Sequence, residues 1–127
     1  MRKTYNGKKI DVSFDAKRCI HAAECVKNLP KVFDTKKRPW INTSNADVDS
    51  IVRVVEMCPS GALEYDRKDG HSNECHNQNV ISVGENNEIY IKGNFTFKYK
   101  NEAYSLNRAI FKGQSGEDEY PFYTLDD

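Results

Sequence analysis

Apolar and polar residues alternate in two parts of the chain, and both parts predict strands. In the first part, residues 8–14 (KKIDVSF) alternate, and residues 62–65 (ALEY) begin another extended run. In the second part, alternation covers three segments separated by polar turns, namely NVISV (79–83), EIYIKGNFTFKY (88–99) and AYSLNRAIF (103–111). The C-terminal half is therefore predicted to be β-structure.

Two segments of the first half have helical features. Residues 22–28 (AAECVKN) predict a short helix that ends before Pro30, because the residue before a proline is disfavoured in the helical region. Residues 46–57 (ADVDSIVRVVEM) predict a longer helix, with Ser44 or Asn45 as its N-cap. The expected buried stripe of this helix is Val48, Ile51, Val52 and Val55.

A polar stretch separates the two patterned parts. Residues 66–79 contain almost nothing apolar and predict a linker or exposed loop. We expect an α+β protein with a first domain over residues 1–67, a linker over 68–78 and a small β-rich segment over 79–127. Only 38% of the 127 residues are hydrophobic, so the core is expected to be thin and in need of a staple such as a metal centre.

Charge and composition exclude several classes of protein. Nineteen basic and nineteen acidic side chains give zero net charge, which does not favour a nucleic-acid partner. No apolar run is long enough to span a bilayer, so we expect no membrane partner. The N-terminus lacks the apolar region of a secretory signal, so a cytoplasmic location is expected. In that compartment the four cysteines are expected to bind metal or do redox work.

Three cysteines have the spacing of iron–sulfur ligands. A common bacterial run is C-x2-C-x2-C-x3-C-P, and a single-cluster protein draws its Cys-Pro from a distant segment. Cys19 and Cys25 match the first and third positions, and Cys58 is followed by proline, but the middle position is Ala22. The alternatives are buried core cysteines and a zinc site, although the C-x2-C pairs typical of structural zinc are missing.

A cluster also explains the small residues of this loop. A tight loop can aim thiolates and backbone N–H groups at one cuboidal cluster, and Ala22 and Ala23 let the backbone approach closely. Pro59 stops the preceding helix and sets the direction of the Cys58 thiolate.

The segments RCIHAAECVKNLPKVFD, RPWI and CPSGALEY resemble the divergent mono-cluster iron–sulfur domain, a small bacterial ferredoxin-like family. The resemblance covers residues 8–66, and the pattern is also similar to that of three-iron ferredoxins. It implies a ferredoxin-like α+β fold and one cluster, usually 4Fe-4S, with 3Fe-4S as the alternative. It implies Cys19, Cys25 and Cys58 as the ligands.

A second resemblance involves the end of the chain. LNRAIFKGQSGEDEYPFYTLDD is similar to a CDGSH-type iron–sulfur segment and keeps Gly113, Ser115 and the Pro121-Phe122 pair. In that alignment the four ligand positions hold other residues, namely Ile110, Lys112, Tyr123 and Asp127. We therefore expect no metal in this half.

A four-iron cluster would need a fourth ligand, because Ala22 cannot bind iron. The candidates are His21 within the loop and Cys75 in the polar linker, and the corner could also be vacant. His71 and His76 flank Cys75 and could form an adventitious metal site or simply be solvated.

The leading hypothesis is a one-electron carrier that serves a redox partner protein. No nucleophile–base pair is visible in the sequence, so the chain is not expected to be an enzyme. The alternatives are a redox or iron-status sensor, and a non-catalytic interaction protein with a structural cluster.

Overall fold

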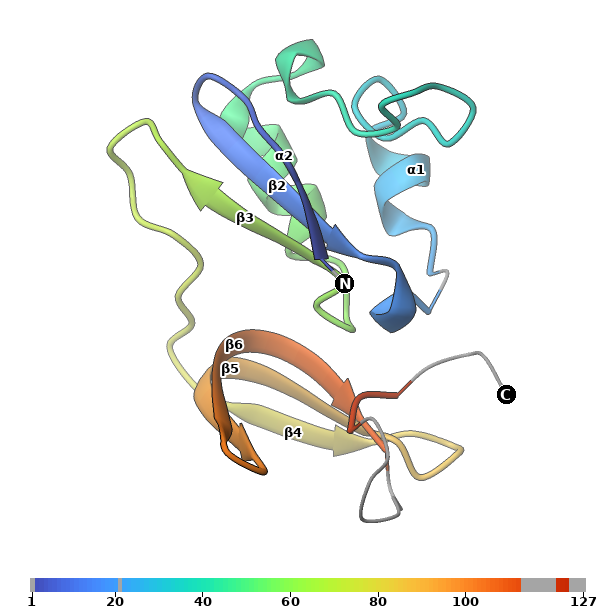
Figure 1. The fold of residues 1–127 in the computed structure, drawn as a ribbon, viewed down its shortest axis with the longest axis vertical. Coiled ribbons are helices and arrows are strands. Elements are labelled where there is room, and N and C mark those ends of the chain that lie inside the picture. Colours follow the sequence, from blue (N-terminus) through green and yellow to red (C-terminus); the bar gives the residue numbers. More distant parts are fainter. Residues whose placement is uncertain (1, 21, 113–120, 124–127) are drawn as a thin grey trace.

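Two antiparallel three-stranded sheets form the framework of the protein. The computed structural model describes residues 2–20, 22–112 and 121–123. The first sheet has the order β1-β2-β3, with β1 at Arg2–Tyr5, β2 at Ile10–Asp15 and β3 at Leu63–Arg67. The second has the order β4-β5-β6, with β4 at Val80–Val83, β5 at Ile89–Tyr99 and β6 at Glu102–Phe111. Figure 1 shows the two sheets one above the other, joined by the linker at one side.

The helices of the described residues all belong to the first half. They are α1 (Glu24–Asn28), α2 (Val48–Val55) and two 3-10 turns, at Ala16–Arg18 and Thr43–Asn45. The protein is thus a strand-rich mixture of sheet and helix, with each predicted helix and strand present.

The predicted cap of α2 is wrong. Asp47 is the N-cap, and its carboxylate accepts a hydrogen bond from the Ser50 amide at 3.0 Å. Ser44 and Asn45 instead lie in a 3-10 turn of their own, which begins where the Asn42 side chain accepts from the Ser44 amide at 3.2 Å. The helix therefore starts later than the sequence suggested.

The first core lies between α2 and the first sheet. Ile51, Val54 and Val55 form the buried face of α2, whereas Val48 and Val52 of the predicted stripe are only partly buried. Phe14 and Trp40 close one side, with their rings edge to face at 4.9 Å. The buried members of this core are Ile10, Val12, Val32, Phe33, Ile41, Ile51, Val54, Val55 and Leu63.

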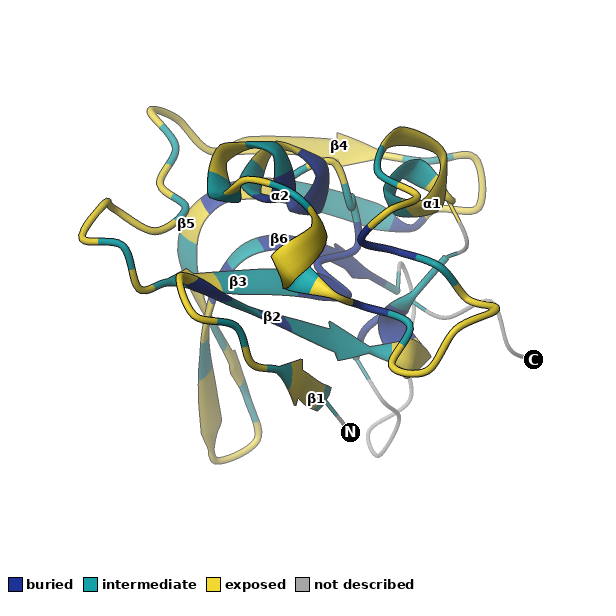
Figure 2. Ribbon diagram, turned by 90° about the horizontal axis from the view of Figure 1, so that it is seen from above, coloured by how far each residue is buried: buried dark blue, intermediate teal, exposed yellow. Residues whose placement is uncertain are grey.

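The second core is smaller and aromatic. Leu106, Ala109 and Phe111 of β6 pack with Phe122, and the Phe97 ring of β5 lies 4.4 Å from that of Phe111. β4 is exposed along its whole length, as Figure 2 shows. None of the described helices is long and apolar enough to cross a membrane.

The halves meet at a loop and a strand. The loop between α2 and β3 points toward β6, and so does the 3-10 turn after β2 (Figure 1). Arg18 from that turn and Arg108 from β6 are 4% and 2% exposed, respectively. Buried arginines are rare and need partners, and their partners lie on the loop that carries Cys58.

Candidate metal centre

Three cysteines come together from three segments of the first half. Cys19 follows the 3-10 turn after β2, Cys25 lies in the first turn of α1, and Cys58 follows α2. All three are partly buried, and Cys25 and Cys58 pack against the first core. This packing keeps part of each thiol away from water.

The thiols interact electrostatically. The pKa of Cys25 is raised from 9.0 to about 11, mainly because burial disfavours the thiolate, and further because Cys58 and Cys19 add negative charge nearby. An iron centre would reverse this balance, because it binds and stabilises thiolates. The two charge contributions indicate that Cys58 and Cys19 both lie near Cys25.

Another group of possible metal ligands lies in the described part of the chain. Glu56, Glu74 and His76 bring their ligand atoms within 4.8 Å of one another.

In the segment that joins Cys19 to Cys25, the described residues just before α1 are exposed. Ala23 has a left-handed backbone (φ 63°) and serves as the N-cap of α1 without a side-chain hydrogen bond. No residue of α1 is buried, and Ala22 and Ala23 are both exposed. The backbone at Ala22 and Ala23 is therefore accessible to a bound group, and only small side chains flank it.

The segment around Cys58 is held by three arginines instead. Arg108 donates to the carbonyl oxygens of Cys58 at 2.6 Å and Leu63 at 2.8 Å. Arg18 donates to that of Ser60 at 2.7 Å. Arg2 adds hydrogen bonds to the carbonyl oxygens of Gly61 at 2.9 Å and Ala62 at 2.8 Å. The sequence pattern did not identify these arginines as residues of the site.

Gly61 allows this loop to approach β6. It has a left-handed backbone (φ +74°), and a Cβ at this position would clash with the Arg108 carbonyl oxygen and with the Arg18 guanidinium. Only glycine combines this conformation with so close an approach. The Cys-Pro-Ser-Gly sequence thus fits a loop packed directly onto the second half.

Of the two candidates for the fourth ligand, the structure describes only Cys75. His21 lies outside the described residues. Cys75 is exposed in the linker, and no interaction in the described part of the chain joins it to the other three thiols. Its neighbours are anchored, because Glu74 pairs with Arg108 at 2.9 Å and the His76 amide donates to Asn94 at 3.0 Å. Through Arg108, which also binds the Cys58 carbonyl, Glu74 ties the linker to the Cys58 loop.

The acidic group beside the linker is already partnered. Glu56 accepts a hydrogen bond from Tyr65 at 2.6 Å, and Glu74 binds Arg108 and also His76, the latter at 2.7 Å. His71 belongs to a different contact, in which its amide donates to Asp69 at 3.2 Å. The structure thus separates the two histidines that flank Cys75 in the sequence.

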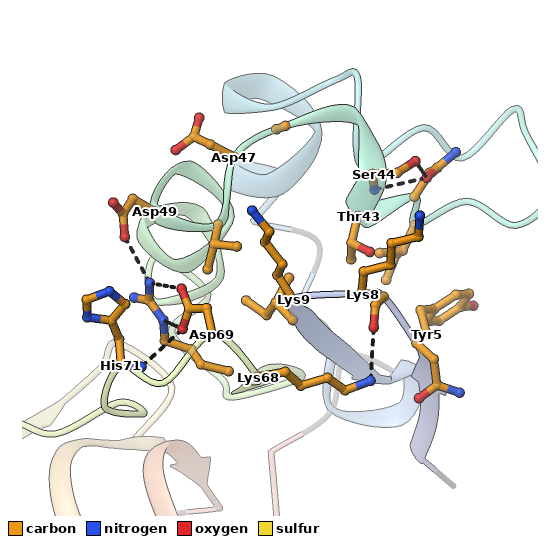
Figure 3. A pocket seen from close by; sticks show the side chains of 18 of the residues that line it. Tyr5, Lys8, Lys9, Thr43, Ser44, Asp47, Asp49, Lys68, Asp69 and His71 are labelled. Carbon is orange, nitrogen blue, oxygen red and sulfur yellow. Dashed lines mark hydrogen bonds and ion pairs between the residues drawn. The ribbon is translucent and has the colours of Figure 1, made fainter.

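A broad surface groove is lined by residues other than the cysteines. It has a volume of about 1240 Å³ and is bordered by the β1–β2 turn, residues 41–49 and the start of the linker (Figure 3). Its charged groups bind one another, because Arg67 pairs with Asp69 at 2.7 Å and with Asp49 at 3.1 Å. The second of these pairs joins the end of β3 to α2 across the groove.

Comparison with known proteins identifies relatives of the first half. Residues 5–68 match the sequence model of a family described as "Divergent 4Fe-4S mono-cluster". Two relatives, from Escherichia coli K12 and Escherichia coli O157:H7, are both named "Uncharacterized protein YjdI". Each is 44% identical over 66 residues, which make up 52% of this chain and 87% of the relative. No solved structure matches the chain.

Proposed function

The chain belongs to the divergent 4Fe-4S mono-cluster family, and from this premise we propose that it binds one cluster and carries single electrons between partner proteins. Cys19, Cys25 and Cys58 are the proposed ligands. The observation that carries the proposal is the grouping of these three thiols, in which Cys58 and Cys19 both raise the pKa of Cys25.

The residues around the thiols suit such a centre. A bound cluster would supply reversible one-electron chemistry. Cys25 and Cys58 pack against the first core, which limits the access of water to the sulfurs. The carbonyl groups of the Cys58 loop are turned toward arginines, so their partial negative charges are compensated rather than directed at the thiolates.

We propose four irons in preference to three. The fourth corner would take Cys75, His21 or neither, and Cys75 is the first candidate because a thiolate binds iron well. EPR spectra of Cys75→Ser and His21→Ala proteins separate these ideas. The variant that shifts the protein toward a three-iron signal identifies the ligand, and two unchanged spectra would show that neither residue binds.

The finer fold assignments belong to the same proposal. A ferredoxin-like arrangement of the first half, and a second half derived from a CDGSH-type segment without its ligands, would explain why only one set of thiols is present. Of that second alignment, Ile110 and Phe122 lie in or beside the second core, whereas Gly113, Ser115 and Asp127 lie outside the described residues. The proposed location is the cytoplasm.

A carrier is distinguished from its alternatives by electrochemistry. The protein, purified without oxygen, should contain iron and sulfide and show a reversible one-electron wave with fast exchange to a small redox mediator. A sensor would instead lose its cluster when oxidised and then change its binding to a partner. A structural cluster would show neither behaviour, and an iron-free stable protein would refute cluster binding altogether.

A further inference from the structure

One arginine of the last strand holds the loop that carries Cys58. Arg108 in β6 is 2% exposed, and its guanidinium donates to carbonyl oxygens at both ends of the loop, those of Cys58 at 2.6 Å and Leu63 at 2.8 Å. These acceptors are 50 and 45 residues away in the sequence. The loop therefore keeps two of its backbone partners only while the second sheet is in place.

Glu74 compensates the charge of Arg108. Its two carboxylate oxygens accept from Nε at 2.9 Å and from Nη2 at 3.0 Å, a two-point contact between side chains that are 2% and 7% exposed. The same carboxylate also contacts His76 at 2.7 Å. The ion pair thus forms a buried unit whose positive member contacts the Cys58 loop directly.

A second arginine ties the loop to the same strand. Arg18, immediately before Cys19, donates through Nη2 to the Ser60 carbonyl at 2.7 Å and to the Arg108 carbonyl at 3.1 Å. Its guanidinium lies 4.2 Å from the centre of the Phe122 ring. Two of the three cysteine segments are thereby fastened to β6.

We propose that the C-terminal half is a clamp for the cluster site, in which Arg108 and Glu74 position the Cys58 loop and set the reduction potential of the cluster. Both residues lie beyond residue 68, where the family match ends, so the clamp is an addition to the family domain. The part that concerns the potential rests on the proposed function, whereas the part that concerns the loop does not.

Because Arg108 and Glu74 carry opposite charges, they should have opposite effects on the reduction potential of the cluster. Reduction adds negative charge to a cluster, so a nearby positive group favours it and a negative group opposes it. Arg108→Gln should therefore lower the midpoint potential, and Glu74→Gln should raise it. The double variant should lie between the two. A merely structural role would move both single variants in the same direction or leave both unchanged.

The matched control is Arg67, which also makes a two-point contact with a carboxylate. Arg67 binds Asp69 at 3.0 and 2.7 Å, and its other carboxylate partner is Asp49, which lies outside residues 58–63. Arg67→Gln should leave the potential at its wild-type value. If Arg108→Gln does not load a cluster, the direction of the Glu74→Gln shift decides, and a downward or absent shift overturns the proposal.

A measurement on the metal-free full-length chain tests the clamp separately. The rate of iodoacetamide labelling of Cys58, followed by mass spectrometry, should rise about tenfold in Arg108→Gln, which corresponds to ~1.4 kcal/mol of loop stability. Labelling of the exposed Cys75 provides an internal standard. Equal Cys58 rates in Arg108→Gln, Arg67→Gln and wild type would refute the clamp. If the wild type holds no iron, the proposed function fails, and this rate still decides the clamp.

Discussion

The two segments that carry the cysteines are built in opposite ways. The Cys58 loop is buried at Ser60 and Gly61, and arginines from three different parts of the chain bind its carbonyl groups. The segment from Cys19 to Cys25 is exposed at its centre and enters α1 through a left-handed alanine without a side-chain cap. One proposed ligand is thus presented by a buried loop, whereas the other two lie at the ends of a segment that is exposed at Ala22 and Ala23.

This difference indicates where order is gained on cluster binding. A pre-organised ligand loses little conformational entropy when it binds metal, whereas a loosely held segment loses more, at about 1–2 kcal/mol for each backbone residue that becomes ordered. We infer that the Cys58 loop acts as a pre-formed platform for the proposed cluster.

The largest effect is expected from removing the ligand on the platform. Cys58→Ser should abolish the brown chromophore and lower the iron content to background, because only two grouped thiols remain. Visible absorbance and iron analysis of anaerobically purified protein measure this. Cys75→Ser is the control for loss of a thiol and should keep the chromophore. Full iron content in Cys58→Ser would show that Cys58 is not a ligand.

Breaking the platform itself should cost less than removing its ligand. Gly61→Ala places a Cβ against the Arg108 carbonyl in a left-handed conformation, which should lower the free energy of unfolding by roughly 2–5 kcal/mol. Gly70→Ala is the matched control, since Gly70 has φ +89° but nothing within 4 Å of the added Cβ. Its cost should be only about 1–2 kcal/mol. Urea unfolding curves that show equal losses would argue against close packing of the loop.

Burial of the Cys25 thiol should make the stability of the metal-free protein depend on pH. The pKa of its thiol is 9.0 in the ordinary environment and about 11 in the folded chain. The unfolded chain therefore releases this proton first, and the stabilisation that is present below pH 9 is lost as the pH rises toward 11. Urea midpoints should fall over this range more steeply in the wild type than in Cys25→Ala. Parallel curves would show that Cys25 is not buried before the cluster binds.

The smallest effect concerns the entry into α1. Ala23 has φ 63°, so Ala23→Gly should relieve left-handed strain and stabilise the metal-free protein by about 1 kcal/mol. Lys100→Gly is a useful comparison because Lys100 has φ 56° in the β5–β6 turn, far from the cysteines in sequence. Thermal unfolding compares the two. A destabilised Ala23→Gly protein would show that the left-handed turn at Ala23 is not the native conformation.

Local patterns were sufficient to predict most elements of this fold. Alternation marked β2, β5 and β6, and the valine and isoleucine spacing marked α2. The pattern did not mark β1, because Arg2–Tyr5 is an edge strand with no buried residue and so carries no alternation. The cap of α2 was misplaced because Ser44 and Asn45 have the same capping chemistry as Asp47, and only the neighbouring turn decides among them.

The site was predictable only in part. Short spacing selected Cys19 and Cys25, and the proline after Cys58 together with the family resemblance selected Cys58. The structure places Cys19 and Cys58 near Cys25. Arg108 carried no such signal, since a polar residue in an alternating strand is ordinarily taken to face water. Its partners Cys58, Leu63 and Glu74 lie 34 to 50 residues away, and only the packing of the two halves shows that they meet.

Binding of one cluster through Cys58 is tested most directly by native mass spectrometry of the anaerobically purified full-length chain. We expect a single adduct with the mass of one 4Fe-4S cluster per chain, and loss of that adduct in Cys58→Ser. A chain that carries one zinc ion, or that stays metal-free after anaerobic reconstitution with iron and sulfide, would contradict it.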